Sequence, residues 1–205
     1  MVGKIFLFIV TALLFQTSSS LKVVLFFGDS LSAGYGLSPE EAFPALVEKS
    51  MIKNGVSVKV VNAGLSGETT AGGLARVDWI LRQPIHVFVL ELGGNDGLRG
   101  LPIDQTKSNL QSIIDKVKKK YPDCKIVLAG MMVPPNMGKD YATSFQNLFK
   151  DIAKKNDATL IPFLLQDVGG IEKLNQADGI HPNAEGHKIV AKHLVEVISP
   201  LVVNN

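Results

Sequence analysis

The sequence predicts an α/β protein: a three-layer α/β/α sandwich with a central, mostly parallel five-stranded sheet. Two observations support this prediction. Five short runs are apolar nearly throughout, as strands buried on both faces are, and helical stretches of ten or more residues alternate with them. The expected strands are 22–27, 56–61, 86–92, 125–129 and 158–161, and the expected helices are 40–54, 71–82, 104–120, 141–155 and 184–198.

Length and composition favour one domain. The 205 residues, 46% of them hydrophobic and 20% charged, are enough to bury one sizeable core and too few to suggest two. The 21 basic and 19 acidic side chains nearly cancel, to a formal charge of +2. The one lysine run, 118–120, lies at the end of an expected helix, where cations suit the helix dipole. No nucleic-acid partner is therefore expected.

The first twenty residues differ from the rest of the chain. Lys4 is their only charge, residues 5–15 are apolar, and a glutamine, a threonine and three serines follow. This order is typical of a secretory signal peptide. An uncleaved anchor is the alternative, but the apolar stretch is well short of the roughly 20 residues that span a bilayer. We predict a signal peptide over 1–20, a domain over 21–205, a periplasmic or secreted location and no stable membrane anchor.

Cysteine usage adds one limit. Cys124 is the only cysteine, so no intrachain disulfide can form, and no cysteine near the leader can receive a lipid. Export is therefore inferred from the leader alone.

The loop after the first expected strand carries a candidate nucleophile. Ligands of open parallel sheets bind beyond the carboxyl ends of the strands. There the sequence reads Gly28-Asp29-Ser30, which places a serine just past a glycine turn. A serine at such a position more often caps the following turn or helix, so Ser30 alone does not establish catalysis.

The next two loops offer donors for an oxyanion. Gly67 lies in the loop after the second expected strand, and Asn95 in the loop after the third. Glycine lets a backbone N–H approach a ligand closely, and an asparagine amide can donate to an oxygen. The N–H groups of Ser30 and Gly67 and the Asn95 side chain could therefore form an oxyanion hole. The alternative is that both loops are ordinary turns.

A base and its partner lie near the C-terminus, in Asp178-Gly179-Ile180-His181-Pro182. A serine hydroxyl needs a base to take its proton, and the base needs a carboxylate that holds its tautomer. One turn can present both Asp178 and His181 as a unit. The other histidines are interpreted as structural or surface residues: His86, His187 and His193.

These residues together resemble the four sequence blocks of the SGNH hydrolases, also called the GDSL family, in the same order. The resemblance extends over residues 22–201, essentially the whole predicted mature chain. The stretches GDSLSAGY at 28–35 and ELGGNDGLRG at 91–100 are similar to those of the exported bacterial acyl-CoA thioesterase I, arylesterase and lysophospholipase subgroup.

The resemblance implies the SGNH-hydrolase fold, which is flavodoxin-like, and a serine esterase that cleaves carboxylic esters and thioesters through an acyl-enzyme. It implies Ser30 as nucleophile, Asp178 and His181 as the rest of the triad, and Ser30, Gly67 and Asn95 as oxyanion donors. The expected partner is a small-molecule acyl ester or thioester. No cofactor is implied, and the sequence has no His-Glu-x-x-His or paired His/Cys spacing that predicts a metal. No Gly-x-Ser-x-Gly nucleophile elbow occurs either.

Three questions stay open at this point. A carbohydrate O-deacetylase and a non-catalytic ligand-binding module on the same fold are alternative functions, although a binder has no need of all four blocks. Met132, Val133 and Pro134 follow the fourth expected strand and are predicted to contact the acyl group, since methionine adapts to irregular apolar ligands. A proline-stiffened connection packed on the core is the alternative for this segment. A monomer and a small homo-oligomer are equally compatible with the sequence.

Overall fold

Five parallel strands form the centre of the protein. The computed structural model describes residues 21–203, so the predicted signal peptide lies outside the described residues. The strands pair in the order β2-β1-β3-β4-β5, and every pairing is parallel. The five-stranded flavodoxin-like sheet is thus confirmed, and it is parallel throughout. The strands are β1 (Lys22–Gly28), β2 (Val58–Asn62), β3 (Val87–Glu91), β4 (Lys125–Ala129) and β5 (Thr159–Ile161).

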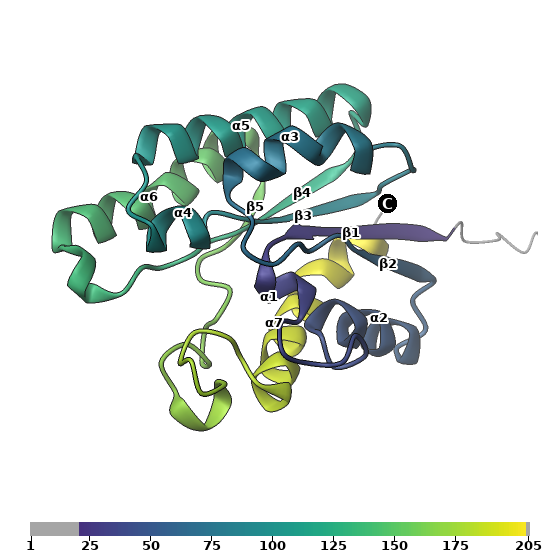
Figure 1. The fold of residues 1–205 in the computed structure, drawn as a ribbon. Helices are drawn as coiled ribbons and strands as arrows, with labels where there is room; N and C mark the ends of the chain where they lie inside the picture. The colour runs from purple at the N-terminus through teal and green to yellow at the C-terminus, as the bar shows by residue number, and fades with distance from the viewer. Residues whose placement is uncertain (1–20, 204–205) are drawn as a thin grey trace, which may run out of the picture.

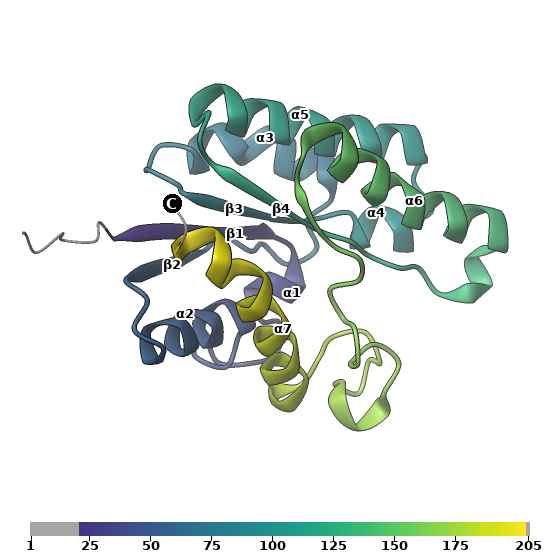
Figure 2. The same ribbon diagram turned by 180° about the vertical axis from the view of Figure 1, so that it is seen from behind.

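Helices cover both faces of this sheet (Figures 1 and 2). Helices α3 (Thr70–Ile80), α5 (Ile103–Lys120) and α6 (Lys139–Asn156) lie on one face, and α2 (Phe43–Lys53) and α7 (Ala184–Val203) lie on the other. Burial on both faces explains why β1 and β3 are apolar almost throughout: Phe26, Phe27 and Phe88 are fully buried. Two 3₁₀ turns complete the chain, η1 (Pro135–Met137) and η2 (Glu172–Leu174). None of the helices in residues 21–203 is long and apolar enough to cross a bilayer.

Two short helices were not predicted. Helix α1 (Ser30–Ala33) follows β1 directly, and α4 (Gly94–Leu98) follows β3; both segments were expected to be loops. The Asp29 carboxylate caps α1 by accepting from Leu31 N. Gly93 enters α4 with φ of 113°, in the region that favours glycine. Because each helix is about one turn long, its sequence has no apolar periodicity to reveal it.

Two long helices also differ from their predicted bounds. Helix α2 begins at Phe43 rather than at residue 40, with Pro44 in its first turn, where a missing N–H costs nothing. Helix α7 continues past the predicted end at 198 and includes Pro200. Ile198 and Val202 are both buried, so packing of the last turn outweighs the hydrogen bond that Pro200 cannot donate.

The strand order places a switch point between β1 and β3. The chain crosses from β1 to β2 on one side and then returns to β3 on the other side of β1. At such a point the loops after the two strands part to opposite faces and leave room for a ligand. Ser30 follows β1 and Asn95 follows β3, so both residues stand at this point.

Candidate active site

His181 lies within hydrogen-bond distance of both Ser30 and Asp178. The imidazole Nε2 of His181 lies 2.9 Å from Ser30 Oγ. Its Nδ1 lies 2.7 Å from Asp178 Oδ2. A ring nitrogen facing a carboxylate carries the proton, which leaves the other nitrogen free to accept one. The arrangement therefore has the order that a base-activated serine requires: nucleophile, base, orienting carboxylate.

Hydrogen bonds within the turn that carries Asp178 and His181 hold its conformation. Asp178 Oδ1 accepts from the N–H groups of Ile180 and His181, at 2.9 and 3.0 Å. The backbone N–H of His181, then its ring, then the N–H of Ile180 together lower the pKa of Asp178 to about 2. The carboxylate is thus ionised across the working pH range, although its side chain is 38% exposed.

Two residues that sequence reasoning missed also hold this turn. The Tyr35 ring packs against the His181 imidazole, with ring centroids 4.6 Å apart. The Gln176 amide donates to Tyr35 O at 2.7 Å and to Pro182 O at 3.0 Å. Gln176 therefore joins the loop after β1 to the turn that carries Asp178 and His181. Tyr35 lay within the GDSLSAGY stretch, which was the signal available; nothing in the local sequence marked Gln176.

A buried carboxyl group supports the turn that carries Ser30. Glu91, the last residue of β3, is fully buried, and its Oε2 accepts from Asp29 N, Ser32 N and Ser32 Oγ at 3.1, 3.2 and 2.7 Å. Position 28 must be glycine here, because a Cβ would stand 2.2 Å from Glu91 Oε2. Sequence reasoning missed Glu91, and the signal was a charge inside an apolar strand.

The predicted oxyanion donors come from three neighbouring loops. Within residues 21–203 neither Ser30 N–H nor Gly67 N–H has a protein acceptor. The amide of Asn95 differs, because its Nδ2 already donates to Asp29 Oδ2 at 3.1 Å and to Glu68 O at 3.0 Å. The two acceptors belong to residues adjacent to Ser30 and Gly67, so Asn95 joins the two loops. A donation by Asn95 to an oxyanion must therefore be shared with one of these bonds.

Arg76 on α3 contacts both the end of β1 and the loop after β2. Its guanidinium pairs with Glu68 at 2.5 and 2.6 Å and donates to Ala63 O at 2.7 Å. It also lies over the Phe27 ring, 4.3 Å from the centroid. The Glu68 side chain is only 3% exposed, so the pair with Arg76 is largely buried. Arg76 holds the segment that contains Gly67 against the end of β1.

The segment predicted to contact an acyl group lies beside α6. Met132 and Val133 line a cavity of about 290 Å³ with Lys139, Ala142, Thr143 and Gln146. Pro134 is exposed and is not among the lining residues. Met131, by contrast, is buried. The structure thus separates Met132 and Val133, which face an open cavity, from Pro134, which does not.

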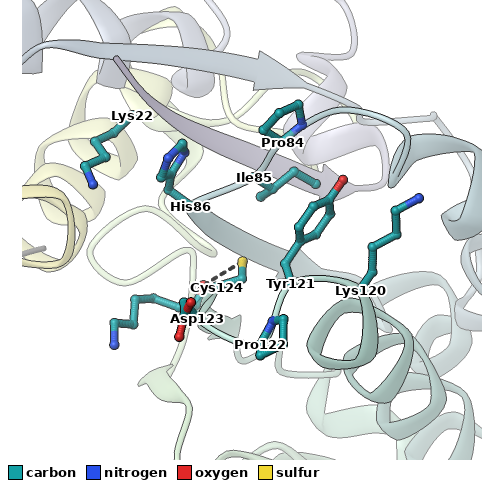
Figure 3. Close-up of a pocket in the computed structure, with 10 residues that line it drawn as sticks. Lys22, Pro84, Ile85, His86, Lys120, Tyr121, Pro122, Asp123 and Cys124 are labelled. Atoms are coloured by element: carbon teal, nitrogen blue, oxygen red, sulfur yellow. Dashed lines mark hydrogen bonds between the residues drawn. The ribbon is translucent and has the colours of Figure 1, made fainter. Parts of the chain in front are cut away.

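His86 and Cys124 lie away from Ser30. His86 Nδ1 accepts from Val23 N at 2.9 Å. Figure 3 shows His86 and Cys124 around a cavity of about 510 Å³ at the amino ends of β1, β3 and β4. This is the edge opposite Ser30, where parallel sheets do not place their sites. Burial raises the pKa of the Cys124 thiol to about 12, so it is not a nucleophile at neutral pH.

The part of the chain that the structure describes offers no set of metal ligands. No group of three or more His, Cys, Asp or Glu side chains there could hold a metal ion. His187 is buried and accepts from Phe43 N at 2.9 Å, while His193 lies 3.7 Å from Asp167. Each therefore has a structural or surface environment, as predicted.

Known proteins resemble this chain over most of its length. Esterase TesA of Pseudomonas aeruginosa is 36% identical over 92% of this chain and 94% of its own. Thioesterase 1/protease 1/lysophospholipase L1 of Escherichia coli K12 is 38% identical over 96% of this chain and 92% of its own.

Solved structures show the same likeness. Esterase EstA from Pseudoalteromonas sp., solved as inhibited by monoethylphosphonate, matches with a TM-score of 0.83 at 32% identity, covering 90% of this chain and 100% of its own. AlinE4, an SGNH-hydrolase family esterase, matches with a TM-score of 0.74 at 40% identity, covering 90% and 96%. The model of the GDSL-like lipase/acylhydrolase family matches residues 26–189. The chain belongs to the GDSL-like lipase/acylhydrolase family.

Proposed function

We propose that the protein is a serine esterase that hydrolyses carboxylic esters and thioesters through an acyl-enzyme on Ser30. The observation that carries this proposal is the relay at 2.7 and 2.9 Å from Asp178 through His181 to Ser30 Oγ. Family membership and relatives named esterase, thioesterase and lysophospholipase support it. The proposal assigns Asp178 and His181 as the other members of the triad.

The mechanism begins when Ser30 Oγ attacks the acyl carbonyl and His181 Nε2 takes the hydroxyl proton. The carbonyl oxygen becomes an oxyanion, which Ser30 N–H, Gly67 N–H and the Asn95 amide stabilise. Collapse breaks the bond to the alcohol or thiol, which leaves with the proton from His181. Water then repeats the sequence on the acyl-enzyme and releases the acid. Asp178, with its pKa lowered to about 2, stays ionised and stabilises the imidazolium that forms on His181.

An apolar acyl group suits the surroundings of Ser30. Leu65, Leu98 and Ile180 are large apolar residues that are 52%, 43% and 48% exposed, and each lies within three positions of a proposed site residue. We propose that Met132 and Val133 add to this acyl-contacting surface, with Pro134 stiffening the segment. Physical separation argues for external esters or lysophospholipids rather than cytosolic acyl-CoA, if residues 1–20 direct export as their layout predicts.

The test is hydrolysis of p-nitrophenyl esters from acetyl to palmitoyl by the chain lacking residues 1–20, with Ser30→Ala as the matched variant. We expect activity that disappears in Ser30→Ala. A preference for acyl chains longer than acetyl identifies a lipid-type esterase. Selectivity for acetyl-sugars would favour a carbohydrate O-deacetylase instead. A folded protein without activity on any ester would overturn the proposal in favour of a ligand-binding module.

A further inference from the structure

Two buried carboxyl groups lie next to each other at the turn that carries Ser30. Glu91 is fully buried and Asp29 is 2% exposed. No lysine, arginine or histidine in the described chain forms an ion pair with either of them. Two adjacent carboxylates without a cation cannot both remain ionised in a buried site. The pair therefore retains a proton at neutral pH.

Glu91 is the member that carries this proton. Burial first, and then the charge of Asp29, raise the pKa of Glu91 well above its usual range. Burial also raises the pKa of Asp29, to about 6, but hydrogen bonds from Leu31 N–H, Asn95 and Glu91 oppose that rise. Glu91 Oε1 is buried and accepts from no N–H or O–H group of the described residues, so this oxygen is free to carry the proton that the Glu91 carboxyl donates to Asp29. Asp29, by contrast, accepts from two donors and is the better site for the charge.

The charged groups around the pair do not alter this assignment. From the catalytic turn, His181 favours the ionised form of Asp29. From α3, Arg76 reaches Gly28 O at 3.5 Å, but its charge is matched by Glu68. From α1, Ser32 contributes only a hydroxyl and an N–H, both donated to Glu91 Oε2.

We propose that Glu91 is a positioning residue whose protonated carboxyl holds the Asp29 carboxylate and, through it, the Asn95 amide that donates to the oxyanion. The inference rests on the proposed esterase function. Asn95 Nδ2 lies between Asp29 Oδ2 and Glu68 O, so the direction of its two hydrogens depends on where Asp29 stands. Ionisation of Glu91 would push the two carboxylates apart and release Asn95. Glu91 thus acts on the reaction without touching the substrate.

Two variants of nearly equal size separate this role from simple packing. Glu91→Gln keeps an acceptor for Ser32 and a donor for Asp29 but cannot ionise. Glu91→Met fills the space with neither. With p-nitrophenyl butyrate at neutral pH, Glu91→Gln should keep kcat near the wild-type value. Glu91→Met should lower kcat about tenfold to a hundredfold with little change in KM, because misplacement of a catalytic group has costs of this order.

A direct observation of the proton completes the test and holds even if Glu91→Met fails to fold. The infrared spectrum of the wild-type protein at neutral pH should contain a protonated-carboxyl band that Glu91→Gln lacks. A merely structural Glu91 would change the melting temperature in both variants and leave kcat of folded Glu91→Met intact. Any one of three results would overturn the proposal: an intact kcat in folded Glu91→Met, an equal loss of kcat in both variants, or the absence of the infrared band. Failure of the proposed serine mechanism would be seen in a separate experiment, as ester hydrolysis that persists in Ser30→Ala.

Discussion

Ser30 and His181 are 151 positions apart in the chain, yet their reacting atoms lie 2.9 Å apart. Each is oriented by contacts of its own: the end of β3 supports the Ser30 turn through Glu91, and Asp178 with Tyr35 orients the His181 ring. A side chain placed in this way loses little entropy when the substrate binds. The residues proposed for catalysis are thus already arranged before a ligand is present.

The proposed role of Asn95 as an oxyanion donor can be tested with a single substitution. Removing one oxyanion donor costs about 2.7 to 4 kcal/mol in transition-state stabilisation. Asn95→Ala should therefore lower kcat for p-nitrophenyl esters by about a hundredfold or more, with a small effect on KM. Asn156→Ala removes an amide that bonds Gln111 on α5 and Ile152 O on α6, and it is the control. Full turnover in Asn95→Ala would exclude this residue from the oxyanion hole.

At the scale of elements, α7 is joined to α2 by a buried histidine. His187 lies in the first turns of α7, and its Nδ1 accepts from Phe43 N, at the start of α2. The two rings also stack, with centroids 5.5 Å apart. Because α7 begins just after the His181 turn, this contact anchors the end of the proposed catalytic loop.

The charge state of His187 makes the stability of this junction depend on pH. Burial lowers the pKa of His187 to about 4, from an ordinary value of 6.5. The unfolded chain therefore binds a proton first as pH falls, and folding loses up to about 3 kcal/mol between those two values. Urea unfolding of the wild type and His187→Asn should show a stability difference that shrinks by this amount as pH falls from 6.5 to 4.

Other titratable groups do not disturb the comparison of the wild type with His187→Asn. Asp29, with its pKa raised to about 6, works in the opposite sense, since the folded state holds its proton more tightly. It is present in both proteins, so its effect cancels. His193→Asn, at a partly exposed position beside Asp167, serves as the control. A stability difference for His187→Asn that stays constant with pH would show that His187 is not held neutral.

At the scale of the whole molecule, the sheet order brings the loops after β1, β2 and β3 to one edge. Sequence alone predicted this arrangement because strands buried on both faces are apolar almost throughout, as β3 illustrates with five buried residues of which only Glu91 is charged. It also predicted Ser30, Asp178 and His181 as neighbours, from their loops and from the family resemblance. Their geometry fits that prediction, and their catalytic roles remain a proposal.

What the sequence could not predict are contacts between distant segments. Glu91 supports Asp29 across 62 positions, and the Gln176 amide reaches Tyr35 O across 141. Such pairs have no local sequence pattern, because the tertiary fold, and not the adjacent residues in the sequence, brings the two partners together. Helices α1 and α4 were missed for the opposite reason, since one turn is too short for periodicity to appear. The supporting residues of the site are therefore visible only in three dimensions.

The most direct test of the serine mechanism is to locate a covalent adduct. The protein would be treated with a p-nitrophenyl alkylphosphonate, which transfers its phosphonyl group to an activated serine with release of p-nitrophenol. Mass spectrometry of the intact chain and of its peptides then counts and places the group. We predict one phosphonyl group per chain, on Ser30, and none in Ser30→Ala. An adduct on another residue such as Ser66, or one that persists in Ser30→Ala, would contradict Ser30 as the nucleophile.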